Sequence, residues 1–557
     1  MTSMKRYIIY SLLVMLGAMS SCKKDFLERV PLDAIVDETF WKTEQHLILG
    51  LNSCYAYVKA KNAVDIDQMG DNSFNSSATN AYRLISSGNY TYDLATVNNQ
   101  WADQYEGIRH CNNFLANYNR AEGVSVERRE ALAAEARVIR ALLYSYLTFF
   151  FGDVPLVDKP LKITEVYGPR DPQEKVIDFI LSDLDLAAQH LPREIPTGAN
   201  LGRISKGAAL ALKARVALYA KRYDVAEKAA QDVVDLGVYQ LYSNGNPKTS
   251  YNELFTWEGK LSRGKNKETI LARTYLADIT MHNLSREIQV PDQSSRFNPT
   301  KALVDSYLDT LGYPITHPSS VYRETNYRDI FRNRDPRMMQ TILTPGAAWG
   351  GRKDGNPANT NQSIFTAPRF ISGNPGGSVT LTGFYFTKYV HVPTVGQVSK
   401  DENDIHLIRY AEVLLTLAEA KLEQGKLTQD DVDKTVNLIR ARVGMVPMDL
   451  DWLEANGLDV REEIRRERRI ELALEGQRWF DLMRWKQGDL LAADVKGMKK
   501  SFATVAADVA SLRADAQGYI IVNDGRRFED PKHYLLPVPM EQVNRNKNLG
   551  QNTGWTN

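Results

Sequence analysis

Few side chains in this chain have the types and the spacing that catalysis requires. Ser262 and Lys265 stand three residues apart, as in enzymes that activate a serine with a lysine, but no SDN or KTG segment accompanies them. The chain contains no HExxH, GxSxG or GxxxxGK[ST] motif, and its eight histidines are scattered without metal-ligand spacing. By pattern we find no catalytic constellation, no cofactor motif and no metal site, and this absence alone is weak evidence against an enzyme. Paired catalytic carboxylates leave no sequence signature, so a glycoside hydrolase stays open as an alternative.

A different chemistry is indicated at Cys22, which ends a short apolar segment. A basic start precedes an apolar run of thirteen residues, 7–19, whereas a helix that spans a bilayer needs about twenty. Two serines then lead directly to the cysteine, and Met19 stands where leucine is commonest in a bacterial lipobox, which this segment resembles. We expect residues 1–21 to be a lipoprotein signal peptide and Cys22 to carry fatty acyl chains. The alternative is an ordinary signal peptide with an incidental cysteine.

The composition limits the partners of the remaining chain, residues 22–557. With 69 basic and 68 acidic residues the net charge is +1, which argues against nucleic acid or an anionic membrane surface as a partner. Hydrophobic residues at 43% and charged residues at 25% are typical of a water-soluble globular protein. Cys54 and Cys111 are too few for a disulfide framework, and the sequence leaves open whether they pair.

Three separate regions have the apolar spacing of paired amphipathic helices. Residues 205–237 predict two helices, the first capped by Ser205 and the second ended by Gly237. Residues 407–444 repeat this pattern, with Gly425 after the first helix and a capping box formed by Thr428 and Asp431 before the second. A third stripe covers residues 132–150. Such tetratricopeptide-like hairpins bury their apolar faces only by stacking, so the sequence predicts one mainly α-helical scaffold.

Long irregular segments separate the helical regions. Residues 61–100, 238–300 and 340–400 are rich in Gly, Asn, Ser, Thr and Pro, with few strand-like pieces such as "GFYFTKYV". Long irregular segments on a rigid scaffold usually form functional surface. We therefore expect one interleaved body with long loops and few short strands, rather than a string of domains.

The densest group of charges lies in residues 461–485, "REEIRRERRIELALEGQRWFDLMRW". On one continuous helix, Glu462 would face Arg465, Arg468 would face Glu471, and Glu475 would face Arg478. Because these charges oppose one another, they predict a solvated or interlocked structural face and no nucleic-acid site.

The order of these segments resembles the SusD/RagB family of Bacteroidetes outer-membrane lipoproteins. The quoted matches span nearly the whole mature chain, and "ERRIELALEGQRWFDLMRW" is the most specific of them. The others are "AAEARVIRALLYSYLTFFFGDVPLV", "AALALKARVALYAKRYDVAEKAAQDVV", "IRYAEVLLTLAEAKLEQG", "VNLIRARVG" and "HYLLPVPMEQVNRNKNLGQN". The charged residues after Cys22 also resemble the surface-export signal of such lipoproteins.

The resemblance implies a lipid-anchored protein on the outer face of the outer membrane. It implies pairing with a SusC-like TonB-dependent transporter, for which the protein binds glycans, and it implies no catalysis. Some family members bind peptides, so a peptide-binding RagB-like protein is the alternative. A surface glycoside hydrolase is a third hypothesis.

In this family, ligand contacts tend to come from the N-terminal irregular region and from central loops. An oligosaccharide offers a flat apolar face and a rim of hydroxyls, so its site needs aromatic rings flanked by amides, carboxylates and arginine. The nominated ligand-binding residues are Asp71, Asn72, Tyr82, Arg83, Trp101 and Trp349. We expect exposed rings at Tyr82 and Trp349, whereas the spacing of Trp101 and Tyr105 favours a place in a helical core.

Overall fold

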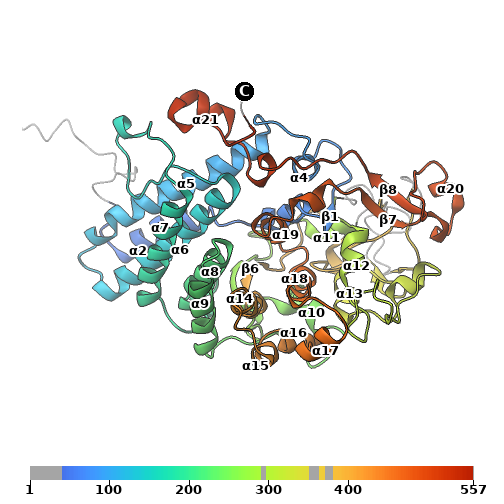
Figure 1. The fold of residues 1–557 in the computed structure, drawn as a ribbon. Helices are drawn as coiled ribbons and strands as arrows, with labels where there is room; N and C mark the ends of the chain where they lie inside the picture. The colour runs from blue at the N-terminus through green and yellow to red at the C-terminus, as the bar shows by residue number, and fades with distance from the viewer. Residues whose placement is uncertain (1–39, 290–295, 350–362, 371–379, 556–557) are drawn as a thin grey trace, which may run out of the picture.

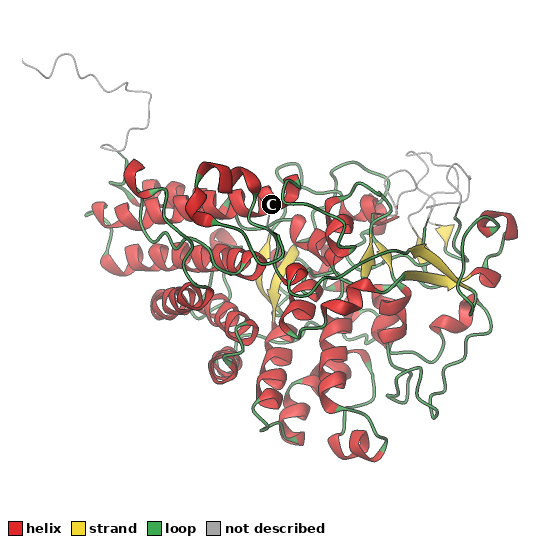
Figure 2. Cartoon of the chain, turned by 45° about the horizontal axis from the view of Figure 1, so that its top comes forward, coloured by secondary structure: helices red, strands yellow, loops and turns green. Residues whose placement is uncertain are grey.

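The computed structural model describes residues 40–289, 296–349, 363–370 and 380–555. The predicted signal peptide and Cys22 lie outside the described residues. Long helices pack together in one half of the molecule, and the other half combines shorter helices, short strands and long loops (Figure 2). The predicted fold class, a mainly α-helical scaffold with few short strands, is therefore confirmed.

Among the described residues, β1 is the only strand before residue 269, so helices dominate the first half of the chain and the other strands lie in the second half. The longer helices are α2 Glu44–Tyr55, α5 Ala95–Asn117, α6 Val126–Phe151, α7 Gln173–His190, α8 Lys206–Tyr219, α9 Tyr223–Asp235, α14 Tyr410–Glu423 and α18 Val460–Glu471. The shorter helices are α3 Asn62–Asp65, α4 Ala81–Ser86, α10 Ser250–Glu253, α11 Leu284–Gln289, α12 Lys301–Ser306, α13 Pro336–Thr341, α15 Gln429–Lys434, α16 Val436–Val443, α17 Leu450–Ala455, α19 Arg478–Arg484, α20 Ala506–Val509 and α21 Met540–Arg545. The strands are β1 Ser73–Phe74, β2 Thr269–Arg273, β3 Asn298–Pro299, β4 Ala348–Trp349, β5 Ser363–Ile364, β6 Ile405–Arg409, β7 Val495–Lys499 and β8 Tyr519–Asn523.

Successive helices α5 to α9 pack side by side in chain order and form the scaffold (Figure 1). The apolar stripe predicted at residues 132–150 lies in α6, which begins after Ser125 and ends at Gly152, whose φ of +74° a side chain would oppose. The hairpin predicted at residues 205–237 is α8 and α9. The hydroxyl of Ser205 does not cap α8, because it bonds the Tyr239 hydroxyl at 2.9 Å.

The second predicted hairpin differs from its expected form. Its capping box at Thr428 and Asp431 is confirmed. Its second helix is interrupted at Thr435, where φ of −128° and ψ of −85° separate α15 from α16. Leu407 lies in strand β6 and not in the first helix, because its segment pairs with β2. Helical periodicity in the sequence does not show such long-range pairing.

The strands form four separate two-stranded antiparallel pairs, β1–β3, β2–β6, β4–β5 and β7–β8. Within the segment "GFYFTKYV" only Phe386 makes a β-bridge, to Ile342, so the expected strand there is wrong. The β1–β3 pair is important for the site, because it places the segment around residue 74 beside residues 298 and 299.

The charged segment 461–485 is interlocked with the rest of the core. Helix α18 ends at Glu471, so Glu475 and Arg478 do not share its face. Arg468 Nε bonds Asp481 at 2.9 Å, and Arg478 Nε bonds Asp71 at 2.6 Å. The expected pairs Arg468–Glu471 and Glu475–Arg478 are therefore wrong, whereas Glu462–Arg465 is present at 3.3 Å.

A buried cluster of five basic and five acidic side chains joins α18 to distant segments, and its formal charges cancel. Arg409, for example, contacts Glu268 and Glu471 at 2.7 Å and Glu475 at 2.8 Å. The other members are Asp335, Arg337, Lys388, Arg440, Arg442 and Glu467. Removing one partner of such a pair leaves an uncompensated buried charge, so the cluster fixes the register of α18.

Cys54 on α2 and Cys111 on α5 are buried and free, so they form no disulfide bond in this structure.

Among the described residues, no helix combines the length and the apolar character that crossing a membrane requires.

Candidate functional site

A pocket of about 460 Å³, which we call the polar pocket, lies between residues 61–82 and residues 287–297. It is lined by Lys61, Asp65, Gln68, Asn75, Ser76, Ser77, Asn80, Tyr82, Glu287, Arg296 and Phe297. Its two sources are segments that the sequence marked as irregular, 61–100 and 238–300.

Amide side chains shape the N-terminal wall of the polar pocket. Asn75 Nδ2 donates to Gln68 Oε1 at 2.5 Å, while Asn75 Oδ1 accepts from the Ser77 amide at 2.9 Å. Asn80 caps α4 by accepting from the Arg83 amide at 3.1 Å. Such side-chain to backbone bonds hold a turn that has no regular structure of its own.

Alternating charges line another part of the polar pocket, which we call the charged wall. Lys61 Nζ lies 3.0 Å from Asp65 Oδ1 and 2.7 Å from Glu287 Oε2, and Arg296 Nη1 lies 3.4 Å from Glu287 Oε1. Burial lowers the pKa of Lys61, but Asp65 and Glu287 outweigh burial, so the net pKa is raised. Burial also raises the pKa of Asp65, which Lys61 opposes. The wall therefore offers donors and acceptors at nearly balanced charge.

Tyr82 supplies the partly exposed aromatic ring of the polar pocket. Burial, followed by Asp65 and Asp103, raises the pKa of its hydroxyl, so the group remains a protonated donor at neutral pH. Arg83, the next nominee, turns away from the pocket. Its Nη1 donates to the Ser76 carbonyl at 2.7 Å, and its guanidinium lies 4.6 Å from the centre of the Phe74 ring. Arg83 thus supports the loop that carries Tyr82.

Asp71 and Asn72 do not line the polar pocket. Asp71 is buried between Arg478 at 2.6 Å and Arg469 at 3.0 Å. Burial raises its pKa, but the two guanidinium groups outweigh burial and hold the pKa well below its usual range. Asn72 Oδ1 accepts from Arg469 Nε at 2.8 Å. Asp71 lines another cavity of about 290 Å³, together with Arg469 and Arg526.

The two nominated tryptophans are both buried. Trp101 is 4% exposed and packs against Tyr105 and Phe151, as the core interpretation of its spacing predicts. Trp349 is 6% exposed and packs against Phe365 and Tyr385. The expectation that Trp349 is exposed is wrong, because β4–β5 pairing turns its ring into an aromatic cluster. Neither ring presents an open face to a ligand in this structure.

The structure brings together residues that sequence reasoning missed. Lys61 is 226 residues from Glu287, and none of Lys61, Glu287 and Arg296 belongs to a motif, so no local signal identifies them. Asn80 had a usable signal, because an asparagine directly before "AYRLIS" is a typical helix N-cap. Glu287 lies on the short helix α11, where its role depends on contacts 226 residues away.

Comparison with known proteins connects this geometry to a family. The model described as "SusD family" matches residues 267–555, which is more than half of the chain. The chain belongs to the SusD family. A second family model, described as "Starch-binding associating with outer membrane", matches residues 25–218. The two matches together cover both sources of the polar pocket.

Individual SusD-like proteins align with almost the full length of the chain. A SusD-like protein of Formosa agariphila is 24% identical, with 96% of each chain covered. A SusD-like carbohydrate-binding protein of Bacteroides fragilis has a similar structure, with a TM-score of 0.77, 29% identity, and coverage of 92% of this chain and 100% of that one. A laminarin-binding SusD-like protein has the same fold, with a TM-score of 0.64, 21% identity, and coverage of 92% and 100%.

Proposed function

We propose that this chain is a non-catalytic cell-surface lipoprotein that binds glycans and delivers them to a SusC-like TonB-dependent transporter of the outer membrane. Membership of the SusD family supports the class of protein. The family description that names starch binding and the outer membrane, and the carbohydrate-binding relative of Bacteroides fragilis, support the ligand and the location. The observation that carries the proposal is the composition of the polar pocket.

The polar pocket has the groups that an oligosaccharide needs. The apolar face of a sugar ring can lie on Tyr82, while its hydroxyls bond amides and carboxylates on both walls. A volume of about 460 Å³ is in the range of small-molecule sites. Asp65 and Glu287 both contact Lys61, so each carboxylate is held in an ion pair. A glycosidase instead needs one protonated carboxyl and one free carboxylate on either side of the scissile bond, so this arrangement favours binding.

We expect Tyr82→Ala to weaken binding of neutral oligosaccharides roughly tenfold, because it removes a stacking surface and a hydroxyl donor. Calorimetric titration of the native protein against a panel of oligosaccharides first identifies the ligand. The same titration then measures the affinity of the Tyr82→Ala variant for that ligand. Tyr167→Ala is the matched control, since Tyr167 is 56% exposed and lies outside the polar pocket. Equal affinity of the Tyr82→Ala variant and the native protein would remove the polar pocket as the ligand site.

Two further outcomes separate the alternatives. A peptide pool that binds where no oligosaccharide does would identify a peptide-binding, RagB-like member of the family. Steady release of reducing ends from a bound polysaccharide by the purified protein would show a glycoside hydrolase and overturn the non-catalytic proposal.

A further inference from the structure

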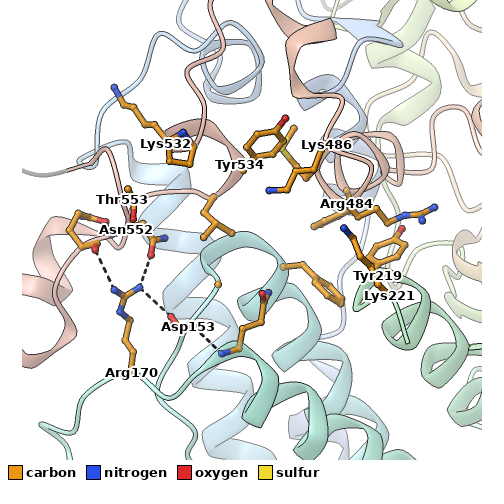
Figure 3. A pocket seen from close by; sticks show the side chains of 18 residues that line it. Asp153, Arg170, Tyr219, Lys221, Arg484, Lys486, Lys532, Tyr534, Asn552 and Thr553 are labelled. Carbon is orange, nitrogen blue, oxygen red and sulfur yellow. Dashed lines mark hydrogen bonds between the residues drawn. The ribbon is translucent and has the colours of Figure 1, made fainter. Parts of the chain in front are cut away.

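A second pocket, also of about 460 Å³, lies at the junction of the helical scaffold and the C-terminal segment. We call it the cationic pocket. The ends of α6, α8 and α19 form it, together with residues 531–535 and 551–553 (Figure 3). None of its lining residues belongs to the polar pocket. The two pockets are therefore separate sites on the molecule.

Basic side chains dominate the lining of the cationic pocket. The lining contains one carboxylate, Asp153, and five basic side chains: Arg170, Lys221, Arg484, Lys486 and Lys532. Two of these charges are compensated, because Arg484 contacts Glu419 at 2.6 Å and Lys532 contacts Glu529 at 3.2 Å.

Three cations of this pocket form no ion pair with any carboxylate of the described residues: Arg170, Lys221 and Lys486. Arg170 is held by neutral acceptors, since its Nε donates to the Leu549 carbonyl at 2.7 Å and its Nη1 to Asn552 Oδ1 at 2.6 Å. Its guanidinium is thus held by neutral acceptors; burial lowers its pKa, and the nearby Asp153 carboxylate opposes this change. Figure 3 shows Lys221 and Lys486 on one side of the pocket and Arg170 on the other.

The two lysines have an unusual backbone conformation in common. Lys221 has φ of +59° and Lys486 has φ of +58°, the left-handed region that glycine prefers. Each lysine follows the end of a helix, and the amide of the next residue donates back into that helix. After Lys221, the Arg222 amide donates to the Ala217 carbonyl at 2.8 Å. After Lys486, the Gln487 amide donates to the Leu482 carbonyl at 2.9 Å. Glycine or asparagine is usual at this position of the motif. Lys221 and Lys486 both occupy this strained conformation, and both line the cationic pocket. Strain of this kind at two lysines of one pocket indicates that their side chains have a function.

The remaining lining is aromatic and neutral. Lys486 Nζ lies 3.9 Å from the centre of the Tyr534 ring, and Tyr219 and Phe480 add apolar surface. A pocket of this size is much larger than an inorganic anion needs. Cations around an aromatic wall match a sugar ring that carries a carboxylate, because its ring face is apolar and its acid group is charged.

We propose that the cationic pocket is a second ligand site that binds the carboxylate group of an acidic oligosaccharide, such as one that contains uronic acid. The choice of a sugar rests on the proposed function, whereas the choice of an anion rests on the three cations that form no ion pair. The acid would lie between Lys221 and Lys486 on one side and Arg170 on the other.

The test is calorimetric titration of the purified protein with a uronic acid trimer and with the same trimer after its carboxyl groups are reduced. We expect the acidic trimer to bind at least about tenfold more tightly, and about 0.5 M salt to reduce this difference. The double variant Lys221→Met, Lys486→Met should lose about tenfold in affinity for the acidic trimer, whereas Lys486→Arg, which keeps the charge, should retain it. Lys248→Met, at an exposed loop lysine, is the control.

The outcomes separate this inference from the proposed function. Equal binding of acidic and reduced trimers, or an unchanged affinity in the double variant, would overturn the acidic-sugar site and leave neutral-glycan binding at Tyr82 intact. Inorganic sulfate that binds as tightly as the trimer would also overturn it, because the pocket would then recognise an anion and no sugar. Loss of neutral-glycan binding in Tyr82→Ala, with acidic-trimer binding preserved, would support two independent sites.

Discussion

At the scale of single residues, Asp67 is a titratable group of the core whose pKa is strongly raised. It is fully buried, and burial raises the pKa of its carboxyl to about 7, with Lys388 opposing the rise. An unfolded aspartate titrates near pH 3.9. Between these values the folded protein holds a proton that the unfolded chain has released. The contribution of this group to stability is therefore complete at low pH and is lost as the pH rises through 7.

We expect the contribution of Asp67 to the free energy of unfolding to fall by roughly 3 kcal/mol between pH 5 and pH 8. The loss accrues over the two pH units from 5 to the folded pKa of about 7, at about 1.4 kcal/mol per unit. Asp67→Asn cannot ionise, so its stability relative to the native protein should rise over this range. Urea unfolding at both pH values measures the difference. Asp93→Asn, at an exposed aspartate, serves as the control. A difference between Asp67→Asn and the native protein that does not change with pH would refute the buried, protonated carboxyl.

The nominated site residues show what local sequence could and could not predict. Residue types in the irregular segment 61–100 led to the nomination of Tyr82, which lines the polar pocket. The same reasoning could not tell that Tyr82 lines the polar pocket whereas Asp71 is buried elsewhere. Asp71 is buried because it pairs with Arg469 and Arg478, about 400 residues further along the chain. Composition predicts where polar groups gather, whereas burial depends on partners that only the fold supplies.

At the scale of elements, the turn between α18 and α19 connects the ionic core to the polar pocket. Gly476 in this turn has φ of +72°, and a Cβ there would lie 2.2 Å from the Ala63 carbonyl oxygen. Ala63 lies between Lys61 and Asp65, so this close backbone contact sets the position of one pocket wall. Glycine is required here both by conformation and by space.

We expect Gly476→Ala to lower the free energy of unfolding by about 3 kcal/mol, from left-handed strain and from the clash with the backbone. Gly457→Ala is the matched control, because Gly457 has φ of +68° but an added Cβ would meet nothing within 4 Å. The control should lose only about 1 kcal/mol. Urea denaturation of both variants measures the difference. Equal losses would show that the contact with Ala63 does not constrain the turn.

The predicted elements were most accurate where one helix buries a continuous stripe. Helices α6, α8, α9 and α14 follow from apolar spacing, and glycines of positive φ follow three of them, at Gly152, Gly237 and Gly425. These are local properties. The prediction failed at Leu407, whose segment pairs with β2, and in residues 461–485, where Arg478 pairs with the distant Asp71. Charges at helical spacing predicted pairs along one helix, but burial gave these arginines long-range partners.

At the scale of the whole molecule, the proposed location depends on Cys22, which lies outside the described residues. We expect Cys22→Ser to abolish incorporation of labelled fatty acid and to release the protein from the membrane fraction, because acyl chains supply about 0.8 kcal/mol per buried methylene. Cys54→Ser is the control, since Cys54 is buried in the folded body. Labelling that persists in Cys22→Ser would contradict the anchor. Protection of the native protein from protease added to intact cells would contradict surface exposure.

The last residues of the chain complete a structure that the first helices begin. The Leu536 amide donates to the Phe150 carbonyl at 2.7 Å, and Asn552 Nδ2 donates to the Phe151 carbonyl at 2.9 Å, so both close the end of α6. Figure 1 shows the C-terminal segment running back beside the N-terminal helices. A ribosome must therefore finish almost the entire polypeptide before the end of α6 gains these partners. That delay suits the proposed export of the chain, which would require threading through a translocation channel before folding.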